Sequence, residues 1–221
     1  DAPTPRVERI THLRSKEAVL QHLRSDQQTP VDLYQDPCAR FILYELHPEH
    51  FIFYSRIHHL AADGYAMNLL EARCIQHHLA RCRGLRPPQA LGAVKTTRGE
   101  DQAYLHSPKH NKDRAFWLEK LSTYDEVLSL SPTTALTDHR FLYAQQHVNP
   151  AFSTALLEFA ARHDCSWADV LTLLTAAYIA RHTGQYDSVF GVPSMGRLGQ
   201  RSALTIATVM NVAPLPLWIQ E

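Results

Sequence analysis

The chain has 221 residues, 45% of them apolar and 20% charged, which is the balance of a globular protein with room for one large domain or two lobes. Its 22 Lys and Arg residues equal its 22 Asp and Glu residues, so no basic surplus points to nucleic-acid binding. The four cysteines form no C-x-x-C pair, which favours a reduced setting. No apolar run reaches the roughly 20 residues of a membrane span, and the N-terminus lacks the apolar core of a signal peptide. We therefore expect a cytoplasmic protein with no membrane contact.

The first part of the chain is predicted to contain a helix and a β-hairpin. Residues 15–24 place apolar side chains on one helical face, and Ser15 is a suitable N-cap. Residues 39–46 and 51–59 are rich in β-branched and aromatic residues, and the four-residue turn between them predicts a hairpin. The second strand is apolar on both faces over its first half, which predicts that it is buried within a sheet.

Helices and short strands alternate along the rest of the chain. We predict helices over residues 65–83, 100–121 with a break at Ser107-Pro108, 150–163 and 166–183, and strands over residues 140–148, 188–192 and 206–219. Gly84 is a suitable C-cap, and residues 84–100 are predicted to be a loop. Residues 122–138 are rich in Ser, Thr and Pro and are predicted to link two lobes.

The most informative segment lies between the second strand of the hairpin and the helix that follows it. It reads His58-His59, three residues, then Asp63-Gly64. A histidine at a strand end can face a cleft, and its ordinary pKa of roughly 6.5 suits proton transfer near neutral pH. Since side chains alternate along a strand, we expect the two histidines to point to opposite sides. A glycine at this point permits a tight or left-handed turn.

Each of these residues also has a purely structural interpretation. A histidine at the end of a buried strand can simply be packed and hydrogen-bonded. Asp63 precedes a helix, where its carboxylate favours the positive end of the helix dipole, and capping is our main interpretation of this residue. From these residue types alone, both interpretations of the histidines stay open.

A second cluster, on the helix predicted after the motif, has the residue types of a metal site. Cys74, His78 and Cys82 recur every four residues, and these side chains are zinc ligands in other proteins. A fourth ligand at suitable spacing is missing, and three ligands along one straight helix do not converge easily. We therefore prefer the interpretation that they belong to the apolar face of the helix, and we expect no metal.

The segment RIHHLAADGYA resembles the active-site signature of the condensation domains of nonribosomal peptide synthetases, which belong to the chloramphenicol acetyltransferase-like superfamily. Three more segments resemble the same family in the family's order: PVDLYQDPCARFILYEL, YLHSPKHNKDRAFWLEKL and GVPSMGRLGQRSALTIATVMNVAPLPL. The last of them is most similar to condensation domains of siderophore synthetases. Together the four segments cover nearly the whole chain.

The resemblance implies an α/β fold, the chloramphenicol acetyltransferase-like two-lobe sandwich, a V-shaped pseudo-dimer, here incomplete. A full condensation domain is about twice as long, and the family's opening Arg-His-x-x-Leu-Arg motif is absent. We therefore expect an internal fragment. Residues 1–135 would be the second half of the N-terminal lobe, and residues 136–221 the first half of the C-terminal lobe.

The resemblance also implies an acyltransferase reaction that forms an amide. The amine of an acceptor aminoacyl thioester attacks the thioester carbonyl of a donor. No prosthetic group binds the chain directly, because both substrates hang on 4'-phosphopantetheine arms supplied by donor and acceptor peptidyl carrier protein domains. An adjacent adenylation domain is a further expected partner. The identity and stereochemistry of the joined substrates are not implied.

The family's site residues map onto the following positions. His59 takes a proton from the attacking amine or holds that amine in line, and both roles stay open. His58 is expected to be structural, and the N–H of Gly64 to face the developing oxyanion. Asp63 is expected to form an ion pair with Arg197 that shapes the site. Asn211 either hydrogen-bonds near the cleft or is a buried strand residue satisfied by backbone.

Two alternatives share the fold. An epimerisation domain keeps the histidine motif, although the Met-Asn-x-x-Pro-Leu strand is more typical of condensation. A non-catalytic docking domain of the same fold recruits partner enzymes and usually lacks the active histidine. A cyclisation domain is disfavoured, because that class replaces the His-His pair with Asp residues.

Overall fold

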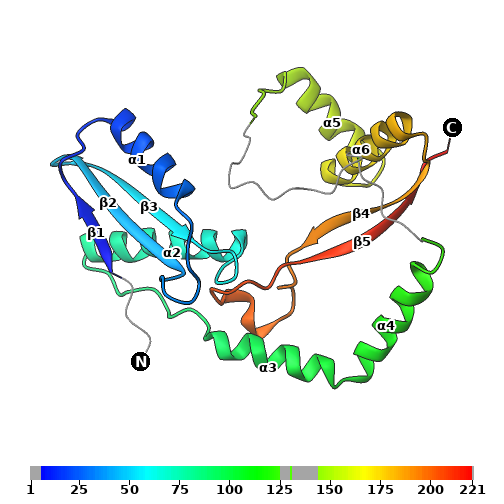
Figure 1. The fold of residues 1–221 in the computed structure, drawn as a ribbon, viewed down its shortest axis with the longest axis horizontal. Helices are drawn as coiled ribbons and strands as arrows, with labels where there is room; N and C mark the ends of the chain where they lie inside the picture. Colours follow the sequence, from blue (N-terminus) through cyan, green and yellow to red (C-terminus); the bar gives the residue numbers. More distant parts are fainter. Residues whose placement is uncertain (1–5, 125–129, 131–143, 221) are drawn as a thin grey trace. The chain divides into compact units, whose positions relative to one another are not determined.

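The computed structural model describes residues 6–124, 130 and 144–220, and they fall into two compact units (Figure 1). The first unit comprises Asp1–Ser107 and Ser194–Asn211, and the second comprises Pro108–Pro193 and Val212–Glu221. The predicted lobe boundary between residues 135 and 136 lies outside the described residues and stays a prediction. No helix in the described ranges is long and apolar enough to cross a membrane.

Helices and strands mix in both units. The elements are β1 (Val7–Ile10), α1 (Lys16–Gln28), β2 (Ala39–His47), β3 (His50–Ile57), α2 (Gly64–Cys82), α3 (Val94–Leu105), α4 (Pro108–Lys120), α5 (Pro150–Arg162), α6 (Trp167–Thr183), β4 (Asp187–Ser194), the 3₁₀ helix η1 (Arg201–Leu204) and β5 (Asn211–Trp218). The α/β fold class is confirmed.

The first unit contains a three-stranded sheet in the order β1-β2-β3. β2 and β3 are antiparallel, which confirms the predicted hairpin, and β1 pairs with β2 in parallel. The sequence patterns did not predict β1. Within the described residues β3 lies at the edge of the sheet, and Phe51 and Phe53 are each 43% exposed. The prediction that β3 is buried on both faces is therefore wrong for this chain.

Helices lie on both faces of this sheet (Figure 1). Val19 of α1 is fully buried against Ile42 and Tyr44, which alternate along β2 and so share one face. On the opposite face the hydroxyl of Ser55 in β3 donates to the carboxylate of Glu71 in α2 at 3.5 Å. The start of α1 is as predicted, because the hydroxyl of its N-cap, Ser15, accepts a backbone N–H at 3.1 Å.

A buried carboxylate connects α1 to both strands of the hairpin, β2 and β3. Asp26, at 6% exposure, pairs with Arg40 of β2 and with Arg56 of β3, which are direct cross-strand neighbours. The hydroxyl of Tyr54 also donates to it, at 2.9 Å. Because two like charges directly opposite one another are destabilising, the carboxylate between them holds this end of the hairpin together. The motif histidines follow two residues after Arg56.

Three local predictions differ from the structure. Residues 94–99 are helical and belong to α3, although they were predicted to be loop. Residues 144–149 have no regular structure, which contradicts the strand predicted over 140–148 in the part that the structure describes. The C-cap of α2 is Arg83, and Gly84 follows it with a φ of +63°.

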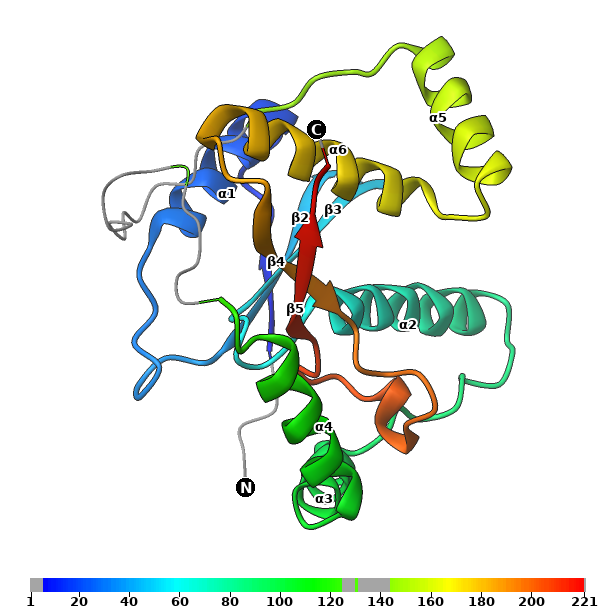
Figure 2. The same ribbon diagram turned by 90° about the vertical axis from the view of Figure 1, so that its right-hand side faces the viewer.

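The second unit contains the helices α4, α5 and α6 and most of the two-stranded sheet of β4 and β5. α5 and α6 contact each other, and β4 pairs with β5; these four elements are labelled in Figure 2. Ser166 and Asp169 form a capping box at the start of α6, and Gly184 ends that helix in the left-handed conformation. The predicted helices over 150–163 and 166–183 and the predicted strand over 188–192 are confirmed with small shifts at their ends, whereas the strand predicted over 206–219 begins only at Asn211, so residues 206–210 are not part of it.

Candidate functional site

The two motif histidines lie in the turn that follows β3. β3 ends at Ile57, so the expectation that His58 and His59 alternate along a strand is wrong. His58 is half-buried. Its backbone N–H donates to the carbonyl of Cys38 at 2.7 Å, and its Nδ1 accepts the N–H of Leu60 at 3.2 Å. These two bonds give His58 a structural role in the turn.

His59 is exposed at the outer side of the same turn. Within the part of the chain that the structure describes, its imidazole makes no hydrogen bond, while its backbone carbonyl accepts a hydrogen bond from the hydroxyl of Thr208. An exposed imidazole whose nitrogens make no such bond is accessible to an incoming amine. His59 therefore has the accessibility that either expected role requires.

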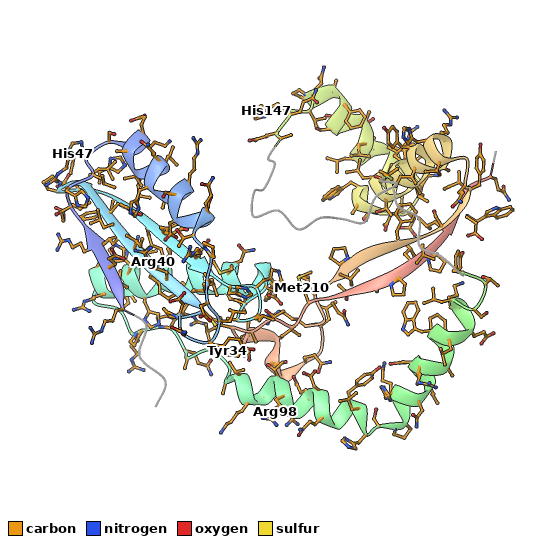
Figure 3. The ribbon with its side chains drawn as sticks, viewed as in Figure 1. Tyr34, Arg40, His47, Arg98, His147 and Met210 are labelled. Atoms are coloured by element: carbon orange, nitrogen blue, oxygen red, sulfur yellow. The ribbon has the colours of Figure 1, made fainter. Side chains whose placement is uncertain are left out.

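Asp63 begins α2 and is the most heavily hydrogen-bonded side chain of the motif. It is 1% exposed, and its Oδ1 accepts the N–H of Ala66 at 2.8 Å, so it caps the helix as predicted. Its Oδ2 accepts the N–H groups of Val209 and Met210 at 2.9 and 3.0 Å. Met210 is labelled in Figure 3, directly before β5. We call residues 205–210, the segment between η1 and β5, the strap.

The ion pair expected between Asp63 and Arg197 is present. Nη2 of Arg197 lies 3.0 Å from both carboxylate oxygens, and the arginine is itself only 4% exposed. The guanidinium also donates to the carbonyls of Thr205 at 2.9 Å and Ala207 at 2.7 Å, and it lies 5.0 Å above the ring of Tyr65. One buried arginine thus connects the start of α2 to the strap.

These contacts determine the protonation of Asp63. Burial raises the pKa of a carboxyl group, but the N–H groups of Val209, Ala66 and Met210 and the guanidinium of Arg197 more than offset that effect. The pKa of Asp63 is lowered to about 2, so the carboxylate is ionised throughout the neutral range. Asp63 is therefore a buried negative charge at the start of α2.

Other elements of the first unit support the strap from η1. The carboxylate of Glu100 in α3 accepts the hydroxyl of Ser202, the N–H of Arg201 at 2.6 Å and the N–H of Ser202 at 3.3 Å. These bonds, the one from the Ser202 hydroxyl first, lower the pKa of Glu100. Gly92 pairs with the buried Thr205, and a Cβ at Gly92 would meet the Thr205 hydroxyl at 2.4 Å.

Gly64 and Asn211 differ from expectation. Gly64 is the first residue of α2, has no positive φ, and a Cβ there would meet nothing within 4 Å, so the turn does not require a glycine for conformational reasons. The position is exposed, which leaves room beside the backbone for a bound group. Asn211 begins β5 and is exposed, so the interpretation as a buried strand residue is wrong.

The cluster of Cys74, His78 and Cys82 lies on the exposed surface of α2, and its assignment to the apolar face is wrong. Cys82 Sγ and His78 Nε2 are 3.6 Å apart. Among the described residues no group of three or more His, Cys, Asp or Glu side chains is arranged to hold a metal ion. All four cysteines are free thiols.

Comparison with known proteins identifies the family. The family model "Condensation domain" matches residues 4–221. A dimodular nonribosomal peptide synthase of Bacillus subtilis is 34% identical over 207 residues, which cover 93% of this chain and 9% of that protein. The starter condensation domain of rhizomide synthetase, solved as a mutant with C8-CoA, superposes with a TM-score of 0.85 at 26% identity, over 99% of this chain and 50% of that one. VibH, a condensation enzyme, gives 0.80 at 26% identity, over 100% of this chain and 52% of that one.

The chain belongs to the condensation-domain family. It spans about half the length of the solved condensation domains that it matches, and a smaller share of the curated synthetases. The predicted fold of this family is confirmed for the length of the chain.

The sequence patterns missed several contacts of this condensation-domain site. Thr208, Val209 and Met210 are close to the motif only because the strap returns to it from about 145 residues later in the chain. Two of the three contribute backbone N–H groups, which any residue type except proline supplies, so no side-chain pattern could have marked them. The helix that contains Glu100 was predicted to begin at residue 100 instead of Val94, and no sequence pattern connected Glu100 with η1.

Proposed function

We propose that the protein containing this chain joins a donor acyl group to an acceptor aminoacyl group, both held as thioesters on carrier domains, and so acts as an amide-forming condensation domain of a nonribosomal peptide synthetase. The observation that carries this proposal is the exposed imidazole of His59 on a turn whose neighbouring residues are all held by hydrogen bonds. The resemblance of the loop and strand around Arg197 and Asn211 further favours a siderophore synthetase.

In the proposed reaction the acceptor amine attacks the donor thioester carbonyl. A C–N bond forms, the C–S bond to the donor arm breaks, and the amine loses a proton. His59 either takes that proton or accepts a hydrogen bond that holds the amine in line. A positioned general base contributes about 10²- to 10⁴-fold, and holding two tethered reactants together contributes a further large share of the rate. The thiolate of the donor arm is the leaving group, and the proton lost by the amine converts it to the thiol.

The remaining motif residues have supporting roles in this proposal. Asp63 and Arg197 neutralise each other in a buried position and keep the strap against the start of α2. His58 stabilises the turn through its bonds to Cys38 and Leu60. The N–H of Gly64 is at the positive end of the α2 dipole, where an oxyanion is favoured. For Asn211 we propose contact with substrate, supported by its exposure beside the strap.

The proposed partners follow from the reaction. Donor and acceptor peptidyl carrier domains supply the 4'-phosphopantetheine arms, and an adenylation domain loads the acceptor carrier. The chain itself holds no prosthetic group in this scheme. The match to a dimodular synthase supports such a multidomain setting, and a cytoplasmic location stays a prediction.

The test is a single-turnover reaction of the full-length protein with donor and acceptor carriers loaded with a panel of aminoacyl and aryl groups. Mass spectrometry of the acceptor arm detects an amide, and chiral chromatography of released residues detects inversion. An amide product supports condensation. Inversion at the carrier-bound residue without an amide would indicate an epimerisation domain. If no carrier pair gives either product, the non-catalytic docking function is favoured.

A further inference from the structure

Thr208 is the only strap residue whose side chain, as described, donates to the backbone of the histidine turn. Its exposed hydroxyl donates to the carbonyl oxygen of His59, across a separation of 149 residues in sequence. The next two strap residues, Val209 and Met210, donate their N–H groups to Asp63. The strap therefore contacts the turn at two points, one on either side of the residues between His59 and Asp63.

These contacts leave the main chain around His59 little freedom. On its N-terminal side, the N–H of His58 is bonded to Cys38. On its C-terminal side, the N–H of Leu60 is bonded to His58 Nδ1, and the N–H of Ala61 donates to the His58 carbonyl at 2.8 Å. Among the described residues, the His59 carbonyl itself accepts a hydrogen bond from Thr208 only. Since the imidazole makes no bond of its own among the described residues, its direction depends on the backbone of His59, which places the Cα–Cβ bond, and on the side-chain torsions that this backbone allows.

We infer that Thr208 is a positioning residue, which fixes the peptide unit of His59 and thereby aims the imidazole at the reacting amine. This inference rests on the proposed function, because it assigns Thr208 a role in the same step. Rotation of the His59–Leu60 peptide plane would change the backbone angles beside the His59 Cα and swing its side chain. Errors of about 1 Å in the placement of a reacting group cost up to about 100-fold in rate, so loss of one such bond has a measurable effect.

The test uses the full-length protein in the single-turnover amide assay, with the carrier pair that gives the most amide with wild type. Thr208→Val keeps the shape of the side chain and removes the donor, and Thr208→Ser restores the donor. Thr175→Val is the matched control, because its hydroxyl also donates to a backbone carbonyl, that of Leu171, at 2.8 Å on the exposed side of α6. Each Thr208 variant is also made in the His59→Ala background.

We expect Thr208→Val to lower the single-turnover rate constant about 10-fold with unchanged apparent affinity for the acceptor carrier. Thr208→Ser and Thr175→Val stay within about twofold of wild type. In the His59→Ala background Thr208→Val has no further effect, because a residue that acts through His59 has nothing left to position. If Thr208→Val does not fold, as judged by thermal unfolding, Thr208→Ala replaces it under the same criteria.

The inference is overturned if Thr208→Val stays within twofold of wild type, if Thr208→Ser loses as much as Thr208→Val, or if Thr208→Val lowers the rate by the same factor with and without His59. Each of these results leaves the proposed function intact, provided that wild type forms the amide and that His59→Ala forms it about 100-fold more slowly. A wild type that forms no amide overturns the proposed function instead, and the inference with it.

Discussion

The buried pair of Asp63 and Arg197 makes the sharpest prediction about stability. Asp63→Asn keeps the size of the side chain but removes its charge, and the amide NH₂ that replaces one oxygen must face a backbone N–H, either that of Ala66 or those of Val209 and Met210. Arg197, at 4% exposure, loses its counter-charge. We expect the free energy of opening the strap to fall by about 3 kcal/mol.

Two independent estimates support that figure. Removing one partner of a buried ion pair costs about 3–5 kcal/mol. Lowering the pKa of an Asp from about 3.9 in an unfolded chain to about 2 is equivalent to roughly 2–3 kcal/mol. The first estimate includes the cost of leaving Arg197 without its counter-charge, and the second counts only the ionisation of Asp63 itself. The two estimates meet near about 3 kcal/mol, and we use that value.

Hydrogen exchange of the full-length protein measures this opening at the amides that contact Asp63. In Asp63→Asn the N–H groups of Val209 and Met210 should exchange on the order of 100-fold faster at pH 7, since each 1.36 kcal/mol is a factor of ten. The control is Asp164→Asn, on an exposed turn, with an expected effect within about 0.5 kcal/mol. Exchange within threefold of wild type in Asp63→Asn would refute the reasoning.

The pH dependence provides a second arm of the same experiment. Because the pKa of Asp63 is lower in the folded than in the unfolded chain, its contribution is fully present above about pH 4 and is lost as pH falls toward 2. Wild-type protection of the strap, corrected for intrinsic exchange, should fall across that window. The Asp63→Asn variant should lack this step, and a step of equal size in both proteins would assign it to other carboxylates.

Two further predictions use the same method. Gly196 has a φ of +61°, and a Cβ there would lie 3.0 Å from the carbonyl oxygen of Val209, so Gly196→Ala should weaken the protection of the strap against exchange by about 1–2 kcal/mol. The control is Gly99→Ala, inside α3 with open space around it, which should stabilise that helix by about 0.5–1 kcal/mol. Ser166→Ala removes the N-cap of α6 and should speed exchange of the Asp169 N–H about fivefold, a loss of about 1 kcal/mol; unchanged exchange there would mean that the cap contributes nothing.

Sequence patterns predicted the elements whose signals are local. The start of α1 was marked by the Ser15 cap, the hairpin by two aromatic-rich runs around a short turn, and α6 by its apolar spacing and the glycine that ends it. The ion pair of Asp63 with Arg197 was also predicted, but only through the family resemblance, because nothing local connects two residues 134 positions apart.

Elements stabilised by distant contacts were not predicted. β1 has only four residues and owes its strand conformation to parallel pairing with β2. α3 begins at Val94 without a side-chain cap, and the contact of Glu100 with η1 stabilises it, so the usual start signal is missing. The exposure of Phe51 and Phe53 depends on what lies beside β3, which their own sequence does not reveal.

The rate of amide formation without the His59 imidazole tests the central claim most directly. The measurement is the single-turnover rate constant of full-length His59→Ala with loaded donor and acceptor carriers, beside wild type and the control His77→Ala, an exposed histidine on α2. We predict a fall of about 100-fold or more for His59→Ala and less than twofold for His77→Ala. A folded His59→Ala protein that forms the amide within threefold of the wild-type rate would contradict the role assigned to His59.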